Sequence, residues 1–238
     1  MSFSVGDGIT SSDASWNFGG ETPHSFQVHV QRSIPFYEAG HVLICQLSDF
    51  FVKSDSVCYE LGTSLGDLSA KLAGHHQIAK PDVRWIALDS EPDMIRHARC
   101  TYGHLPIEFV VEDICEVEYQ KSDFIVAYYT LQFVHPRYRQ LLINRLYESL
   151  HWGGALLMFE KVRGPDARFQ DILSTLYTDF KLNNHYSAEE IFAKTKSLKG
   201  VLEPFSTQGN LDLLTRAGFK DMMTVMKYLC FEGFLAIK

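Results

Sequence analysis

Two hydrophobic periods alternate along most of the chain. Short apolar runs typical of buried strands occur at 56–61, 84–90, 108–114, 122–134 and 155–162. Segments in which apolar residues recur at helical spacing separate these runs, at 65–76, 91–103 and 135–154. Alternating strands and helices predict an α/β fold with a mostly parallel sheet.

Further helical patterns flank this core. Residues 22–52 predict a helical region interrupted at Pro35, and residues 206–219 predict another helix. The segments 222–230 and 233–238 predict a terminal hairpin that turns around Phe231, Glu232 and Gly233. We expect residues 1–20 to be a flexible tail and residues 21–238 to form a single domain, with a helical insertion at about 165–200.

Composition narrows the function classes. The chain has 238 residues, 46% of them hydrophobic, which suffices for one sizeable core. It contains no apolar run of about 18 residues, so we expect no membrane contact. The net charge of −7 and the lack of a basic run disfavour direct binding of nucleic acid. Five cysteines without a CxxC pair, and no signal-peptide pattern, favour reduced thiols in the cytoplasm and no metal site.

A glycine turn follows the first predicted strand. It reads Glu60-Leu61-Gly62-Thr63-Ser64-Leu65-Gly66. Glycine lets a ligand approach the backbone, and the N-terminus of the next helix offers free N–H groups. The turn is not GxGxxG, because Ser64 stands where a second glycine would be. An ordinary tight turn between strand and helix is therefore the alternative.

Acidic residues end the next two predicted strands. Asp89 comes 27 residues after Gly62 and could accept both hydroxyls of a ribose. It could instead cap the helix that starts at Pro92. Asp113 with Ile114 could hold an adenine amine and pack on its ring. The carboxyl ends of parallel strands meet at one edge of a sheet, so these features predict a nucleotide-like ligand site there.

Together these residues resemble the class I S-adenosylmethionine (SAM)-dependent methyltransferases, whose first strand bears E/D-x-G-x-x-x-G. That resemblance implies a Rossmann-like fold with a mostly parallel seven-stranded sheet, SAM as cofactor and S-adenosyl-L-homocysteine as product. Longer blocks are similar to the bacterial carboxy-SAM synthase family: QRSIPFY (31–37), LGTSLG (61–66), YTLQFV (129–134), GGALLMFEK (153–161) and DFKLNNHYS (179–187). That family makes carboxy-SAM from SAM and prephenate for wobble-uridine modification of tRNA.

The resemblance to the carboxy-SAM synthase family implies a set of cofactor contacts. Glu60 and Gly66, which belong to the E/D-x-G-x-x-x-G motif, are added to this set. The contacts that the resemblance implies are Tyr37, Gly62, Thr63, Ser64, Asp89, Ser90, Asp113, Ile114 and Tyr128.

Three positions depart from that family. Thr195 stands where the family has an arginine that pairs with the extra carboxylate of carboxy-SAM, and threonine lacks that charged fork. Lys194 and Lys196 flank it and could substitute. Tyr128 replaces an asparagine, and Thr63 replaces the cysteine of GCS. We therefore favour methyl transfer to a small molecule, such as a 2-oxo acid. Carboxy-SAM synthesis and non-catalytic SAM binding are the alternatives.

Three residues are candidates for catalysis. His135 is the side chain best poised for proton transfer near neutral pH, although it could simply cap the next helix. Glu160 ends a strand at the predicted site, although it could pair with Lys161 or Arg163. Tyr37 carries the family likeness but could be plain packing. By analogy with the family, we also expect a homodimer.

Overall fold

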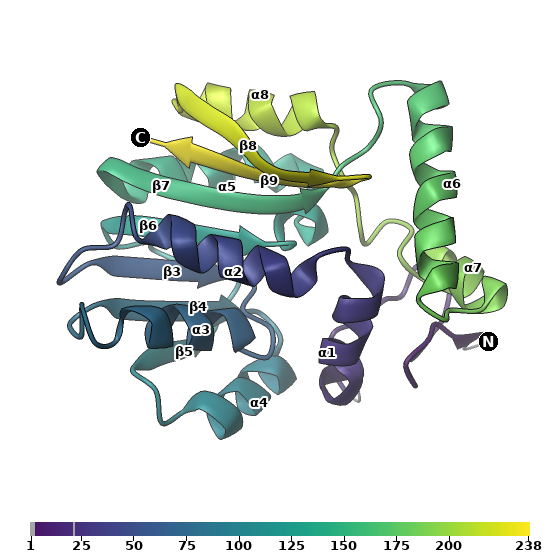
Figure 1. The fold of residues 1–238 in the computed structure, drawn as a ribbon, viewed down its shortest axis with the longest axis horizontal. Helices are drawn as coiled ribbons and strands as arrows, with labels where there is room; N and C mark the ends of the chain where they lie inside the picture. Colours follow the sequence, from purple (N-terminus) through teal and green to yellow (C-terminus); the bar gives the residue numbers. More distant parts are fainter. Residues whose placement is uncertain (1–2, 21) are drawn as a thin grey trace.

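One seven-stranded sheet forms the centre of the protein (Figure 1). The computed structural model describes residues 3–20 and 22–238. The strands lie in the order β5-β4-β3-β6-β7-β9-β8. Their bounds are β3 Val57–Leu61, β4 Arg84–Asp89, β5 Ile107–Val111, β6 Ser122–Tyr128, β7 Leu150–Lys161, β8 Asp221–Tyr228 and β9 Phe231–Ile237. The five neighbouring strands β5, β4, β3, β6 and β7 pair in parallel. Strand β9 pairs antiparallel with both β7 and β8. This arrangement confirms the predicted Rossmann-like α/β fold.

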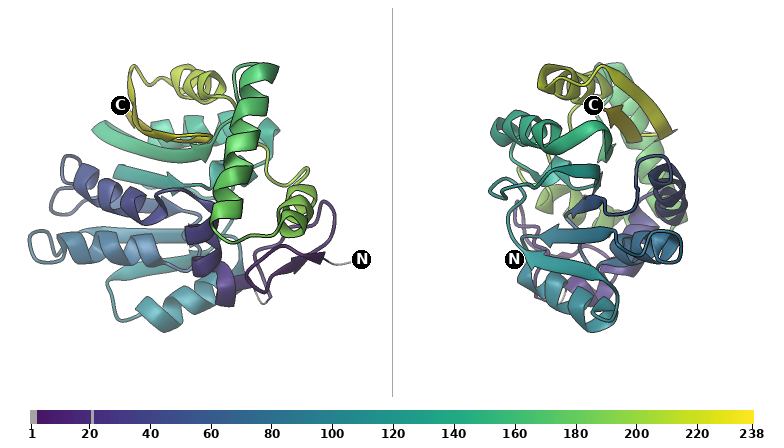
Figure 2. Two further views of the ribbon diagram at one scale, coloured as in Figure 1. Left: turned by 45° about the vertical axis from the view of Figure 1, so that its right-hand side comes forward. Right: turned by 90° about the vertical axis from the view of Figure 1, so that its left-hand side faces the viewer.

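Helices cover both faces of the sheet, as the views in Figure 2 show. Their bounds are α1 Thr22–Ser33, α2 Tyr37–Ser48, α3 Asp67–His76, α4 Pro92–Tyr102, α5 Pro136–Ser149, α6 Ala167–Asn183, α7 Ala188–Ser197 and α8 Thr207–Ala217. Successive strand residues point to opposite faces, so each strand feeds two cores. Tyr59 and Leu61 of β3 pack with α5 and α8, whereas Cys58 packs with α2 and α3.

The helical insertion lies beyond the carboxyl ends of the strands. Figure 1 shows α1, α6 and α7 past the arrowheads of β3, β6 and β7. The insertion comprises α6 and α7, and Ser187 with Glu190 forms a capping box at the start of α7. These helices therefore close the edge of the sheet at which the sequence predicts a ligand.

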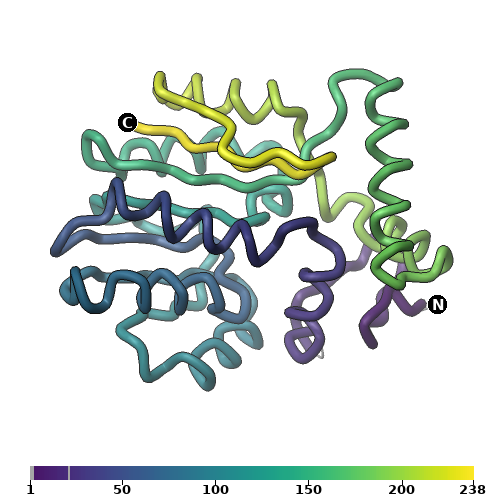
Figure 3. The backbone as a smooth tube through the Cα atoms, in the orientation of Figure 1, coloured from purple at the N-terminus to yellow at the C-terminus, as the bar shows by residue number. Residues whose placement is uncertain are grey.

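The N-terminal residues differ from the flexible tail predicted for residues 1–20. Residues 1 and 2 lie outside the described residues. Strands β1 (Phe3–Ser4) and β2 (Thr10–Ser11) pair with each other and contact α7, and the tube in Figure 3 shows this purple segment beside the green insertion. Val5, Ile9 and Trp16 form a small buried cluster there. Their burial explains why this polar, glycine-rich stretch is folded.

The terminal hairpin turns two residues earlier than predicted. Leu229 and Cys230 form the turn, and Leu229 has a φ of 50°. Phe231 and Glu232, predicted in the turn, belong to β9 and are buried. Glu232 accepts hydrogen bonds from Thr224 Oγ1 at 2.9 Å and Lys227 Nζ at 3.0 Å, so an acidic residue is accommodated inside a strand.

No helix among the described residues is both long and apolar enough to cross a lipid bilayer.

Candidate active site

A cavity of about 540 Å³ opens at the carboxyl ends of β3 to β6. Eleven of the predicted site residues line it. They are Tyr37, Glu60, Gly62, Thr63, Ser64, Asp89, Ser90, Asp113, Ile114, Tyr128 and His135. Gly66 and Glu160 are not among the lining residues. The sheet edge and the N-terminal and inserted helices thus share one cavity.

The glycine turn is shaped by the protein's own packing. Gly62 has a φ of 71°, and a Cβ there would overlap the side chain of Thr130 from the loop after β6. Gly66 has a φ of 86°, and its Cβ would lie 2.9 Å from Phe109. The amides of Gly62 and Thr63 both donate to Leu88 O at 2.8 Å. These two amides are therefore engaged within the protein, and the approach of a ligand to the backbone of Gly62, which lines the cavity, stays a prediction.

Asp89 binds the turn and faces the cavity. It accepts hydrogen bonds from Ser64 N at 2.8 Å and Glu91 N at 2.9 Å. Burial raises the pKa of this carboxyl despite these bonds. The side-chain cap of α4 is Glu91 and not Asp89, so the alternative of a simple cap at Asp89 is wrong. Each carboxylate oxygen retains a second lone pair for a ligand hydroxyl.

Glu60 lies at the floor of the cavity. Its Oε2 accepts from Thr63 Oγ1 at 2.9 Å and from Ser69 Oγ. The side chain is 4% exposed, and burial raises its pKa to about 8. A cation in the cavity would favour the ionised carboxylate. Glu60 and Asp89 therefore make this wall suited to a positively charged ligand.

Aromatic rings form the wall next to Glu60. The rings of Tyr37 and Tyr128 lie 5.1 Å apart, and those of Tyr128 and Tyr129 lie 4.6 Å apart. The Tyr128 hydroxyl donates to Tyr37 O at 2.7 Å, so it braces the start of α2. Burial raises the pKa of Tyr37, so its hydroxyl stays protonated near neutral pH and is not available as a base. Tyr129 Oη is buried without a hydrogen-bond partner among the described residues, which leaves one donor for a ligand.

Two predicted catalytic residues have structural roles. His135 caps α5 by accepting from Arg137 N at 3.3 Å, which confirms the alternative for its side chain, although it also lines the cavity. Glu160 is 2% exposed and accepts from Leu131 N at 3.0 Å. Burial raises the pKa of Glu160 to about 8. Because Glu160 holds the loop after β6 from outside the cavity, we correct its assignment as a group that touches substrate.

Lysines line another part of the same cavity. Lys161 ends β7 and Lys194 lies on α7, and both reach the cavity. The ammonium groups of Lys161 and Lys181 lie 4.4 and 4.5 Å from the centre of the Tyr177 ring. Burial lowers the pKa of each of these three lysines. This side of the cavity therefore suits an anion.

Sequence reasoning missed part of this wall. His29 of α1, Tyr177 of α6 and Trp16 line the cavity, and none belonged to a recognised motif. His29 and Tyr177 lie among apolar neighbours at helical spacing, which marks them as core, and Trp16 lies in the segment predicted as a flexible tail. Arg32 of α1 bonds to Asp7 and donates to Asn184 O at 3.0 Å, so it is engaged within the protein.

A histidine pair lies away from the cavity. The rings of His75 and His76 lie 4.9 Å from each other. Donor atoms of Asp49, His75 and His76 fall within 4.8 Å. His75 Nε2 and Asp49 Oδ1 are 2.9 Å apart, and His76 Nε2 lies 2.7 Å from Ser48 Oγ. These hydrogen bonds account for the cluster, and the absence of a metal stays a prediction.

Comparisons with known proteins agree with this geometry. A family model described as "Methyltransferase domain" matches residues 59–154. Human N-acetylserotonin methyltransferase shares the fold with a TM-score of 0.60 at 17% identity, over 91% of this chain and 54% of that one. A SAM-dependent methyltransferase of Methanosarcina mazei has a TM-score of 0.60 at 16% identity, over 81% and 96% of the two chains. Fold and site define a SAM-dependent enzyme with a class I methyltransferase fold.

Relatives over the whole chain narrow the class. The carboxy-S-adenosyl-L-methionine synthase of Staphylococcus epidermidis is 34% identical over 94% of this chain and 97% of its own length. That of Pectobacterium atrosepticum is 33% identical over 94% and 91%. The chain belongs to the carboxy-S-adenosyl-L-methionine synthase family, and SAM is the cofactor of that family.

Proposed function

We propose that the protein forms carboxy-SAM from SAM and a small organic acid. One observation carries this proposal: Lys161 and Lys194 face the same cavity as Glu60 and Asp89. Such a cavity can hold a cationic nucleoside and an anionic acid side by side. The names of the relatives support this reaction, and our earlier resemblance implies prephenate as the acid. Methyl transfer, which the sequence favoured, becomes the second candidate.

The part of the cavity that carries Glu60, Asp89 and Asp113, here called the acidic wall, fits SAM. Asp89 would accept from the ribose hydroxyls, and Asp113 with Ile114 would hold the adenine. Glu60 would offset the positive charge near the methionine part. Bound SAM supplies a methyl group made acidic and electrophilic by its sulfonium. The aromatic wall of Tyr37, Tyr128 and Tyr129 would exclude water from that methyl group.

The part of the cavity that carries His29, Lys161 and Lys194, here called the basic wall, would hold the acid. Lys194, Leu198 and Leu202 follow each other at four-residue intervals and all line the cavity. Thr195 is exposed, and its hydroxyl donates to Ile191 O at 2.8 Å. The flanking lysine therefore supplies the positive charge that a threonine cannot. This arrangement removes the main reason for preferring methyl transfer.

The overall reaction balances without a further reagent. The acid releases its carboxyl group as CO₂, and the electron pair of the broken C–C bond stays on the remainder of the acid. The methyl group loses a proton and forms a C–C bond to CO₂. The remainder of the acid, or a hydroxide that it expels, takes up that proton. The protein's part is to bring both reactants together and keep water out.

Methyl transfer to the acid is the second candidate, and Tyr128 favours it. Its bulk next to Tyr37 narrows the space beside the methyl group relative to the asparagine expected from the resemblance. Non-catalytic SAM binding is the third possibility.

Mass spectrometry of the small molecule that co-purifies with the protein separates these functions. We expect the mass of SAM plus CO₂, and incubation with SAM and prephenate should generate that mass. S-adenosyl-L-homocysteine, formed with a methylated acid, would replace the proposal by methyl transfer. Bound SAM without turnover of any tested acid would favour the non-catalytic function.

We also propose a homodimer. Phe169, Ile172 and Leu176 form an exposed apolar stripe along α6 at helical spacing, and they are 52%, 48% and 45% exposed. Analytical ultracentrifugation should give twice the monomer mass, and Ile172→Glu should give a monomer. A monomeric wild-type protein would contradict this proposal. Independence from nucleic acid and a cytoplasmic location stay predictions.

A further inference from the structure

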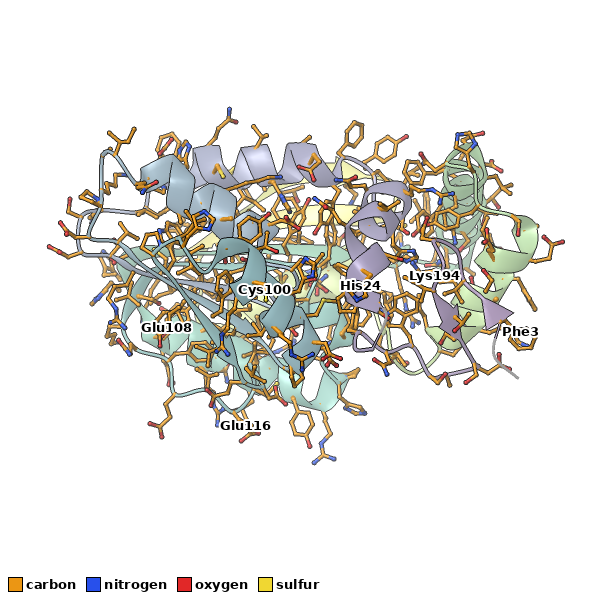
Figure 4. All side chains as sticks on the ribbon, turned by 90° about the horizontal axis from the view of Figure 1, so that it is seen from below. Phe3, His24, Cys100, Glu108, Glu116 and Lys194 are labelled. Atoms are coloured by element: carbon orange, nitrogen blue, oxygen red, sulfur yellow. The ribbon has the colours of Figure 1, made fainter. Side chains whose placement is uncertain are left out.

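A buried chain of polar side chains leads from the N-terminal segment to the cavity. Asp7 Oδ2 and His29 Nδ1 lie 2.8 Å apart, and His29 Nε2 contacts Lys194 Nζ. The side chains of His29 and Asp7 are 2% and 3% exposed. Ser33 Oγ lies 3.4 Å from Lys194 Nζ. Figure 4 shows Lys194 where the green insertion meets the purple N-terminal part.

The hydrogen bonds fix the direction of this chain. The Asp7 carboxylate only accepts hydrogen bonds, so His29 carries its proton on Nδ1. The lone pair on Nε2 then faces Lys194, which donates to it. Hydrogen bonds from His29 and Tyr186 lower the pKa of Asp7 to about 2, and burial lowers that of His29 to about 4. Near neutral pH the pair is therefore an ionised carboxylate and a neutral imidazole.

A glycine turn places Asp7. Gly6, Asp7 and Gly8 have φ values of 95°, 57° and 77°, a region that favours glycine. A Cβ on Gly6 would overlap the ring of Tyr186. The Tyr186 hydroxyl donates to Asp7 Oδ2 at 2.5 Å. The turn, and not a chance contact, thus brings the carboxylate to His29.

The surroundings of Lys194 disfavour its own charge. Burial and the positive charges of Lys181 on α6 and Lys161 on β7 lower its pKa well below the usual value. Arg32 of α1 adds another positive charge near His29. Asp7 acts in the opposite direction, but the imidazole ring separates its carboxylate from Lys194. A bound anion would supply the missing negative charge.

We propose that Asp7 and His29 position Lys194 to bind the carboxylate of the acid, and that Lys194 takes up one proton when this carboxylate binds. The proposal rests on the proposed function only in that the anion is the acid substrate or the carboxylate of carboxy-SAM. Asp7 and His29 are positioning residues, and Lys194 is the group that touches the ligand. The N-terminal segment is then part of the active site.

Calorimetry with SAM and with carboxy-SAM tests proton uptake in the full-length protein. Binding heats in phosphate and in Tris buffer at pH 8 give the number of protons exchanged by each ligand. Glu60 affects both ligands alike, so the difference between them isolates the extra carboxylate. We expect carboxy-SAM to take up about one proton more than SAM, in line with linkage. No difference, with tight binding of carboxy-SAM, would overturn the proposal.

Matched variants test the positioning role. His29→Leu should lower the affinity for carboxy-SAM about tenfold and leave the affinity for SAM unchanged. His29→Gln should restore part of the lost affinity, because its amide oxygen can accept a hydrogen bond from Lys194. Asp7→Asn should also weaken carboxy-SAM. Asp13→Asn is the control, because it removes the same negative charge from an exposed ion pair with Lys196. Equal behaviour of Asp7→Asn and Asp13→Asn would overturn the role of Asp7.

Chemical labelling tests the same chain without any substrate. Cyanate carbamylates neutral amines, and peptide mass spectrometry reads the modification of Lys194 with Lys196 as an internal reference. We expect Lys194 to react at lower pH than Lys196, and Asp7→Asn to lower the midpoint further. If this pattern holds while carboxy-SAM fails to bind, the proposed function fails and the positioning chain stands. An unchanged midpoint in Asp7→Asn would refute the chain itself.

Discussion

The two walls of the cavity differ in charge and in how the chain builds them. The sheet-edge wall carries Glu60, Asp89 and Asp113, from the ends of three adjacent parallel strands. A second, basic wall carries His29, Lys161 and Lys194, from an N-terminal helix, a strand end and an inserted helix. One wall suits a cation and the other an anion. A reaction that joins a sulfonium nucleoside to an organic acid needs both.

The difference shows how a common fold acquires a particular reaction. The acidic wall follows from the topology, because parallel strands end at one edge beside the switch point between β3 and β6. In the basic wall only Lys161 comes from the sheet, whereas His29 and Lys194 depend on additions to the fold, since α1 and α7 lie outside the βα units. Changes to each wall should therefore affect one ligand and spare the other.

The largest expected effect is on SAM binding. Asp89→Ala should weaken SAM about 100-fold, because two hydrogen bonds to a charged acceptor are lost. Binding of an acid to the basic wall should change little. Calorimetry measures the affinity, and Asp93→Ala is a control, since Asp93 on α4 pairs with Arg96 and accepts from Gly20 N but does not line the cavity. Unchanged affinity for SAM in Asp89→Ala would contradict the ribose assignment.

Removing Lys194 should give the reverse pattern. Lys194→Met should weaken carboxy-SAM about tenfold or more, since a hydrogen bond from a charged donor is lost, and SAM should bind as before. Lys196→Met on the same helix is the matched control. An equal loss for both ligands would show that the two walls are not separate.

A pH dependence should mark the acidic wall. Burial raises the pKa of Glu60 to about 8, so its carboxyl is protonated in the free protein below that pH. Cationic SAM favours the ionised form, which means that SAM affinity should rise between about pH 6 and 8 and level off above. Glu60→Gln should flatten this profile. A wild-type profile that falls with pH over this range would contradict the sign.

The smallest expected effect is a gain. Thr195→Arg adds a forked, permanently charged donor next to Lys194. It should tighten carboxy-SAM about three- to tenfold and leave SAM unchanged. Thr195→Lys is the comparison, since lysine lacks the fork. No gain with arginine would mean that position 195 does not match the arginine of the family.

The same contrast explains what the sequence could predict. Strand order, the two helical faces and the acids at the strand ends follow from local patterns, so Asp89, Asp113 and the glycine turn were found. Gly62 also leaves space for the side chain of Thr130, a requirement that no local pattern shows. The predictions for two catalytic residues were incomplete. His135 caps α5, and Glu160 accepts a hydrogen bond from the loop after β6.

The basic wall could not be predicted in this way. Asp7, His29 and Lys194 lie far apart along the chain, and only the packing of three segments brings them together. The polar composition of residues 3–20 hid the three apolar side chains that bury this segment. No period links such positions, so a single sequence carries little signal for them.

The turn at Gly6 and Gly8 has a consequence for tolerance to mutation. By composition this stretch looks like a linker, in which nearly any substitution is neutral. Yet a Cβ at Gly6 would overlap Tyr186, and the backbone at Gly6, Asp7 and Gly8 lies in the left-handed region. In a library of all single substitutions, the first ten residues should therefore contain positions as intolerant as those in the central strands.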